Sequence, residues 1–221
     1  KILCLAIMKC FDPRVRLPGF FTSFLKEAVW RFDATGRIVY LTFDDGPIPE
    51  VTPRVLGILR AEEIKATFFC VGENVMKYPE VYKQILFDGH SVGNHTFNHW
   101  QGIKKGNQDY YRNIEKAGEF VDSDLFRPPH GWLKPSQYQF LKKKFRIIMW
   151  DLISCDYNSR IKPERVFKNI TDFVRPGSII TFHDSIKAQH NLEQTLQLSI
   201  RWMKEQCYRF EAIPYKNRTN R

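Results

Sequence analysis

The stretch Ile-Val-Tyr-Leu-Thr-Phe-Asp-Asp-Gly-Pro at residues 38–47 contains the pattern that decides the fold. Its first six residues are aliphatic, aromatic or β-branched, which is typical of a buried strand. The apolar run then stops at two adjacent carboxylates, Asp44 and Asp45, followed by Gly-Pro, a pair that favours a turn. The sequence therefore predicts a buried strand that delivers two acids at its carboxyl end.

Short apolar runs alternate with segments of helical period outward from this strand to residue 213. Such alternation predicts parallel βαβ units, and six or seven of them fit a closed or nearly closed barrel better than a sandwich. The expected strands are 38–43, 66–71, 91–94, 125–126, 147–153, 178–182 and 210–213, and the expected helices are 51–62, 78–87, 109–121, 135–144, 163–174 and 192–206. We expect one α/β domain over 37–221, preceded by an N-terminal extension, 1–36, that packs on the barrel.

Composition excludes several classes of protein. With 43% hydrophobic and 26% charged residues among 221, the chain is globular rather than intrinsically disordered. The longest apolar run, 2–8, is far shorter than the roughly 20 residues that cross a bilayer, so no transmembrane segment is predicted. Five cysteines without a Cys-x-x-Cys pair argue against a disulfide scaffold or a thiolate zinc site. No clear signal peptide is visible, which leaves the expected location open between the cell envelope and the cytoplasm.

The formal net charge of +10 suggests an anionic partner. The basic runs are short, as at 142–144, and the chain lacks zinc-finger, helix-turn-helix and RNA-recognition patterns. We therefore predict no nucleic-acid partner and expect most of this charge on solvated helix faces. The same charge would also suit phosphate or an acidic surface.

Two acids and two histidines together predict a metal site. Asp44 and Asp45 alone are typical of a turn, but like charges this close raise each other's pKa unless a cation lies between them. A divalent metal would take one aspartate as a ligand and leave the other as a base. His95 and His99 have the i, i+4 spacing that places both imidazoles on one face of a helical turn, where they contact one ion or cap a surface helix. Two histidines and a carboxylate are typical of a catalytic zinc site.

Two further motifs follow predicted strands. The stretch Arg-Pro-Pro-His-Gly-Trp at 127–132 offers an arginine fork for a carboxylate, prolines that fix the loop, and a glycine that lets the backbone approach a ligand. Trp132 either stacks on a sugar ring or closes the core. His183 ends another predicted strand, and this position at the mouth of the barrel favours a role as an acid.

Taken in order, these motifs resemble the signatures of the polysaccharide deacetylases of the NodB-like family, carbohydrate esterase family four. The resemblance covers 37–213, most of the chain. The matching positions are 42–47 for Thr-Phe-Asp-Asp-Gly-Pro, 95–99 for His-Ser/Thr-x-x-His, Arg127, Pro129 and Gly131 for Arg-x-Pro-x-Gly, and, less closely, 180–183 for the last signature.

The resemblance implies a distorted (β/α) barrel of seven or eight strands with one divalent ion, usually zinc. The implied site residues are Asp45, His95 and His99 as metal ligands, Asp44 as general base, Arg127 as the partner of Asp44, and His183 as general acid. The backbone N–H of His130, which follows Pro129, would hold the oxyanion.

Substrate contacts are implied for a second group of residues, namely Pro129, His130, Trp132 and Tyr157. Two positions depart from the family pattern. His130 stands where a tyrosine or tryptophan is usual, and Ile153 stands where the family has an aspartate that supports the catalytic histidine. Asp151, two residues earlier on the same face of the expected strand, is the candidate to tune His183.

The resemblance thus implies a zinc-dependent hydrolase that removes N-acetyl or O-acetyl groups from an acetylated amino-sugar polysaccharide or cell-wall glycan. A catalytically impaired glycan-binding homologue is the first alternative, supported by Ile153. A metal-dependent phosphoesterase is the second, although two-metal phosphoesterase sites need more ligands than the one set found here. The sequence predicts neither the oligomeric state nor the particular sugar.

Overall fold

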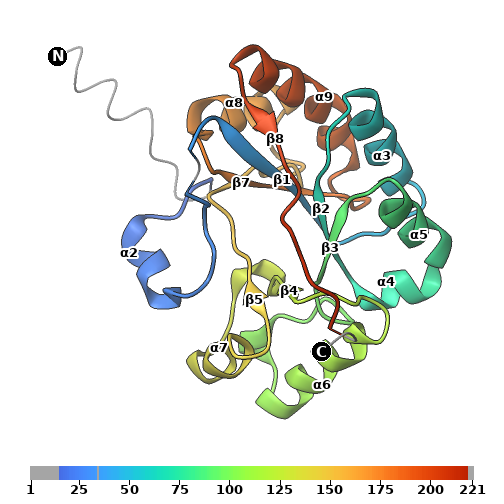
Figure 1. The fold of residues 1–221 in the computed structure, drawn as a ribbon, viewed down its shortest axis with the longest axis vertical. Coiled ribbons are helices and arrows are strands. Elements are labelled where there is room, and N and C mark those ends of the chain that lie inside the picture. Colours follow the sequence, from blue (N-terminus) through green and yellow to red (C-terminus); the bar gives the residue numbers. More distant parts are fainter. Residues whose placement is uncertain (1–14, 34, 219–221) are drawn as a thin grey trace.

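The structure of the protein, a computed structural model, describes residues 15–33 and 35–218 (Figure 1). Residues 1–14, on which the expectations about a leader and the start of the N-terminal extension depend, lie outside these ranges. Among the helices of the described ranges, none combines the length and the apolar character that crossing a membrane requires.

A curled, parallel sheet forms the centre of the fold, with β1 (Ile38–Asp44) in its interior. β1 lies between β2 (Thr67–Cys70) and β7 (Ile179–His183), and Asp44 is in register with His183 of β7. The carboxyl ends of these strands therefore meet at one edge, as expected for a β/α barrel. The fold class predicted from the sequence is confirmed.

The remaining strands extend the sheet in both directions. Its order is β5-β4-β3-β2-β1-β7-β6, and β8 pairs with the beginning of β1. The bounds are β3 Ser91–Asn94, β4 Leu125–Phe126, β5 Arg146–Ile147, β6 Leu152–Ile153 and β8 Arg209–Phe210.

Helices lie around the sheet and cover its outer face (Figure 1). The longer ones are α3 Thr52–Ala61, α5 Pro79–Phe87, α6 Asn107–Gly118, α7 Pro135–Leu141, α8 Pro163–Phe173 and α9 Gln189–Glu205. All six were predicted, whereas the short α4 Gly72–Lys77 was not. Stacked Phe43, Phe68 and Phe182 belong to the main core between strands and helices. The apolar residues that recur with helical period in the sequence thus face the sheet.

The single strand predicted over 147–153 is wrong. The chain instead forms β5 and β6 at opposite edges of the sheet and crosses the opening between them. Each part finds a separate partner in the N-terminal segment, which we define as residues 15–33. Met149 N–H donates to Val29 O at 2.8 Å, and Ile153 N–H donates to Val15 O at 2.8 Å. The hydrophobic pattern of 147–153 does not predict this break, because apolar residues on both sides of Asp151 are buried.

The N-terminal segment follows the barrel across this opening. Val15 is buried in the main core, Val29 forms a parallel bridge with Ile148, and Phe32 N–H donates to Gly177 O at 3.0 Å. Figure 1 shows the short helix α2 (Gly19–Thr22) of this segment on the side of the sheet away from α3. The predicted domain boundary at 36/37 stays a prediction.

Candidate functional site

Four strand ends meet at one cleft of about 560 Å³. Asp44 ends β1, His95 follows β3, Arg127 follows β4, and His183 ends β7. The residues predicted from the sequence that line the cleft are Asp44, Asp45, His95, His99, His130, Trp132, Tyr157 and His183. Arg127 and Pro129 are buried and do not line it. Side chains far apart in the chain are thus brought together by the parallel sheet.

Asp45, His95 and His99 form a candidate metal centre. Their ligand atoms all lie within 4.8 Å of one another. The distance from Asp45 Oδ1 is 3.9 Å to His95 Nε2 and 3.1 Å to His99 Nε2. Ligand atoms bound tetrahedrally to one zinc at its usual bond lengths lie roughly 3.3 Å apart, so this donor set fits a single divalent ion.

The loop that presents the two histidines is not the helical turn that their spacing predicted. Residues 95–99 lack helical structure, and Thr96 (φ 63°) and His99 (φ 54°) have left-handed backbone conformations. Asn113 of α6 shapes the loop, because its Oδ1 accepts hydrogen bonds from the N–H groups of Phe97 at 2.9 Å and Asn98 at 3.2 Å. The imidazoles therefore converge through loop strain and α6, not through helix geometry.

His95 is held in the form that a metal ligand requires. Its Nδ1 lies 2.8 Å from the backbone oxygen of Arg127, which can only accept, so Nδ1 carries the hydrogen and Nε2 is free to bind an ion. Burial lowers the pKa of His95 to about 4, which keeps the ring neutral. Burial alone would raise the pKa of Asp45, but the hydrogen bond from His99 and the charge of His183 outweigh it and hold that pKa well below its usual range.

Asp44 and Arg127 form a buried ion pair beside the metal centre. Arg127 Nη1 donates to Asp44 Oδ1 at 2.7 Å and to Thr42 Oγ1 at 2.8 Å. The other donors of this guanidinium bind the backbone oxygens of Ile148 at 3.2 Å and Met149 at 2.8 Å. Arg127 is therefore fixed in place, and its guanidinium holds the Asp44 carboxylate beside the metal centre.

His183 is supported by Asp156, a residue for which the sequence predicted no role. Asp156 Oδ1 lies 2.8 Å from His183 Nδ1, and Asp156 Oδ2 accepts the backbone N–H of His183 at 2.8 Å. Burial opposes the charge on the ring, but the carboxylates of Asp156, Asp45 and Asp44 outweigh it and raise the pKa of His183 to about 9. The ring is thus protonated at neutral pH and can donate a proton.

The prediction that Asp151 tunes His183 is wrong. Its carboxylate accepts hydrogen bonds from Ser178 Oγ at 2.6 Å, from Arg16 Nη2 at 3.0 Å and from Arg175 Nη2 at 2.5 Å. The prediction assumed alternating faces along one continuous strand, but Asp151 lies in the bend between β5 and β6. Although Ile153 stands where the family has an aspartate, His183 has an acidic partner, because Asp156 supplies it.

Asp184 is a further residue whose role the sequence analysis missed. It is fully buried behind the turn that carries Asp45, accepting the N–H of Gly46 at 3.0 Å and the hydroxyl of Thr52 at 2.6 Å. A Cβ on Gly46 would lie 2.0 Å from the carboxylate of Asp184. The sequence did show an acid directly after His183, the last residue of its strand. Its position in the sequence, however, does not show that this acid contacts Gly46 and Thr52.

The walls of the cleft are aromatic. His130 meets His99 edge to face with ring centroids 4.9 Å apart, and Tyr157 meets His183 in the same way at 4.9 Å. Trp132 is 57% exposed, which favours the first of its two predicted roles, contact with a ligand, over closing the core. The predicted substrate residues His130, Trp132 and Tyr157 thus surround the candidate metal centre, whereas Pro129 lies beneath them.

Comparisons with known proteins agree with this geometry. The sequence model of the polysaccharide deacetylase family matches residues 32–143. One peptidoglycan-N-acetylglucosamine deacetylase of Bacillus cereus is 36% identical over 66% of this chain and 56% of its own length. A second from the same organism is 30% identical over 85% of this chain and 93% of its own length. A chitooligosaccharide deacetylase of Azorhizobium caulinodans is 35% identical over 66% of this chain and 73% of its own length. The chain thus spans little more than half of the first of these relatives but nearly all of the second.

Solved structures show the same architecture. A crystal structure of a peptidoglycan N-acetylglucosamine deacetylase superimposes with a TM-score of 0.81 at 28% identity, covering 89% of this chain and 95% of that chain. A CE4 family pseudoenzyme from Bacillus anthracis shares the fold, with a TM-score of 0.74 over 84% of this chain and 67% of that one at 24% identity. The family match, the relatives and the cleft agree: this chain belongs to the polysaccharide deacetylase family.

Proposed function

We propose that this protein is a zinc-dependent deacetylase that removes N-acetyl groups from an amino-sugar polysaccharide of the peptidoglycan or chitooligosaccharide type. One observation carries the proposal. A candidate metal centre of Asp45, His95 and His99 lies in the same cleft as an acid, Asp44, and a histidine, His183, each with a buried partner of opposite charge. The names of the relatives support the substrate class.

The chemistry requires a nucleophilic water, a polarised acetyl carbonyl and a proton for the departing amine. Asp45, His95 and His99 would hold a zinc ion, which would supply Lewis acidity toward the acetyl carbonyl and the attacking water. The chain's own groups move the protons. Asp44, held in place by Arg127, accepts a proton from the attacking water.

His183 supplies the proton that the leaving amine needs. With its pKa raised to about 9, the imidazolium is the main form at neutral pH. Asp156 holds Nδ1, which leaves Nε2 as the atom that donates. The ring of Tyr157 lies against His183 and limits the positions that the sugar nitrogen can take. The N–H of His130 remains our candidate for binding the oxyanion.

The two alternative functions lose support. A catalytically impaired glycan-binding homologue was favoured by Ile153, but Asp156 supplies the acidic partner of His183. A two-metal phosphoesterase needs a second set of ligands. Among the described residues, the Asp45–His95–His99 cluster is the one group of three or more candidate ligands that converge.

Acetate release tests the proposal directly. The purified protein, stripped by chelator and reloaded with zinc, is offered chitin oligomers, peptidoglycan fragments and O-acetylated sugars. We expect release from the N-acetylated glycans, its loss with chelator and its return with zinc. Asp44→Asn should abolish release while zinc still binds. Failure of the zinc-loaded protein to release acetate from any of these glycans would contradict the proposal.

A further inference from the structure

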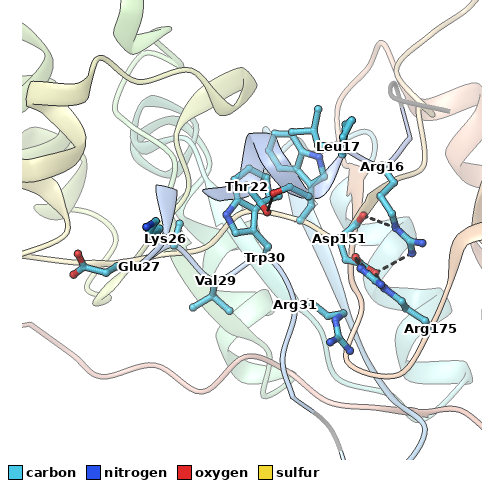
Figure 2. Close-up of a pocket in the computed structure, with 14 residues that line it drawn as sticks. Arg16, Leu17, Thr22, Lys26, Glu27, Val29, Trp30, Arg31, Asp151 and Arg175 are labelled. Carbon is cyan, nitrogen blue, oxygen red and sulfur yellow. Dashed lines mark hydrogen bonds and ion pairs between the residues drawn. The ribbon is translucent and has the colours of Figure 1, made fainter. Parts of the chain in front are cut away.

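A second cavity, of about 800 Å³, lies where the N-terminal segment meets the barrel (Figure 2). We call it the N-terminal cavity; residues between Arg16 and Arg31 form one wall, and Trp150, Asp151 and Arg175 form the other. Leu17 and Trp150 also line the catalytic cleft, so the two hollows adjoin at these side chains. A polymer bound in the cleft can therefore continue into the N-terminal cavity.

Asp151 organises the basic side of this cavity. Figure 2 shows the side chains of Arg16 and Arg175 directed at its carboxylate. Arg175 uses Nε and Nη2 on Asp151, which leaves its Nη1 without a partner among the described residues. The carboxylate of Asp151 is 4% exposed, whereas the side chain of Arg175 is 49% exposed. The arginine is thus fixed at one edge and open to a ligand at the other.

The charge of the N-terminal cavity is positive. Its wall contains four cationic side chains and two acidic ones, and both acids already have partners within the protein. Asp151 has its arginines, and Glu27 binds Lys142, which lies outside the wall, at 2.5 Å. The side chain of Arg31 is held by a hydrogen bond from Nη1 to Pro176 O at 2.9 Å, and its one acidic partner among the described residues is the exposed Asp33, at 3.8 Å. The cations are Arg16, Lys26, Arg31 and Arg175.

Aromatic rings complete the cavity at its junction with the cleft. Trp30 and Trp150 are half-buried and meet edge to face, with ring centroids 6.3 Å apart. Half-buried tryptophans beside fixed polar groups are typical of sites that bind ligands with both apolar faces and polar edges, such as sugars. The cavity therefore combines an aromatic surface with fixed cations.

Accepting the proposed function, we propose that the N-terminal cavity is a subsite for an acidic sugar of the glycan strand. Arg31 and Arg175 bind its carboxylate, and Trp30 and Trp150 contact its ring. The sugar to be deacetylated occupies the catalytic cleft. The glycan then passes Leu17 and Trp150, and its acidic sugar occupies the N-terminal cavity. The cavity thereby selects glycans that carry carboxylates over neutral ones of the chitin type.

The test compares two tetrasaccharides with the same alternating backbone of N-acetylglucosamine and N-acetylmuramic acid. One has free lactyl carboxylates, and in the other they are converted to methyl amides. We expect kcat/KM to favour the free acid by about tenfold. This is the low end of the effect of a charge-assisted hydrogen bond, because the arginines remain accessible to water. In Arg31→Gln/Arg175→Gln this preference should disappear through KM, with kcat unchanged, because the cavity does not contact the reacting atoms.

Matched variants separate this contact from general electrostatics. Arg54→Gln/Arg60→Gln in α3 removes the same charge from exposed side chains on the other side of the fold, and should keep the preference. Arg31→Lys, which retains the charge, should keep most of it. Arg31→Glu, in which the preference should also disappear, replaces the double variant if that does not fold, because among the described residues the side chain of Arg31 bonds only to a backbone oxygen and to exposed Asp33. Equal losses for both tetrasaccharides, or no loss, would overturn the proposal.

Calorimetric titration distinguishes failure of this proposal from failure of the proposed function. The two tetrasaccharides are titrated into the wild type and into the double variant. Tighter binding of the free acid to the wild type alone supports the subsite whether or not acetate is released. Absence of acetate from both tetrasaccharides and from the chitin oligomers would contradict only the deacetylase assignment. Equal affinities in the wild type would overturn the subsite even if both glycans are deacetylated.

Discussion

Asp151 and Asp156 lie five residues apart and have opposite surroundings. Asp156 is fully buried and binds His183, which lines the candidate cleft, with both oxygens. Asp151 faces the N-terminal segment and binds Ser178 and two arginines. Both carboxylates are buried beside cations. What separates them is the partner: a titrating ring that enters the cleft in one case, and guanidinium groups that stay charged in the other.

This difference shows that the role of a buried carboxylate depends on the cationic group with which it pairs. The charge of Asp156 raises the pKa of His183, so removing this carboxylate should change the rate of the reaction. Asp151 joins the N-terminal segment to the barrel, so its removal should change stability. Four substitutions, with Asp172→Asn as a control, test which buried acids act on the chemistry of the site and which on stability.

Asp156→Asn should have the largest effect. Without the carboxylate, the pKa of His183 falls from about 9 toward or below its ordinary value, because burial disfavours the charged ring. We expect kcat to fall by about 100-fold or more. Activity that needs protonated His183 persists up to its pKa, so the alkaline limb of the pH–rate profile should move to lower pH. An unchanged alkaline limb in a folded, zinc-binding variant would contradict the role of Asp156.

Asp184→Asn should affect the metal centre. The variant weakens the hold on the Gly46 N–H and on Thr52, and so loosens the turn that positions Asp45. Partners that orient metal ligands are typically worth about 10–100-fold in metal affinity. Competition with a chelator should measure a loss of this size, while saturating zinc restores kcat. Unchanged zinc affinity would show that the turn keeps its geometry without this carboxylate.

Asp151→Asn should lower the free energy of unfolding by about 2 kcal/mol. Removing one partner of a fully buried ion pair costs about 3–5 kcal/mol, and the exposure of Arg16 and Arg175 reduces this cost. For a chain of this size the melting temperature should fall by roughly 4–8 °C. At temperatures where the variant is folded, kcat for neutral chitin oligomers should stay within about threefold of the wild type.

Asp172→Asn is the matched control for Asp151→Asn. It removes an acid that pairs with Lys168 on the surface of α8, and such pairs contribute little, so melting should hardly change. A tenfold loss of kcat in Asp151→Asn on those neutral oligomers, without loss of stability, would remove the contrast with Asp156.

Ile153→Asp should have the smallest effect. It restores the acid that the family pattern has at this position, but His183 Nδ1 carries a single hydrogen and Asp156 already accepts it. We expect kcat to change by less than about threefold. A tenfold increase, measured as acetate release on a chitin oligomer, would show that Asp156 supports His183 less well than the usual aspartate.

The sequence predicted most of the fold correctly because the relevant signals are local. A buried parallel strand such as β1 is continuously apolar, and a helix such as α9 repeats its apolar positions on one face. The acids of 44–45 and the histidines of 95–99 were found for the same reason, since each motif is contiguous. The helical turn predicted from the spacing of the two histidines was wrong, because tertiary contacts with Asn113 impose a loop there.

The missed features all depend on contacts between distant residues. The choice between Asp151 and Asp156 rests on a break within 147–153, which was predicted as one strand, and each half pairs with a different part of the N-terminal segment. The N-terminal cavity requires residues near position 16 to meet residues near 150 and 175. Such pairings leave no periodic signal in the chain.

By itself, the sequence determined that this protein is a parallel β/α barrel with acids and histidines at the ends of its strands, because hydrophobic period and contiguous motifs are properties of neighbouring residues. Only the tertiary structure decided which aspartate supports His183, how the histidines converge beside Asp45, and that a basic cavity adjoins the cleft. Hydrogen bonds and ion pairs depend on distance in space, which chain order does not specify.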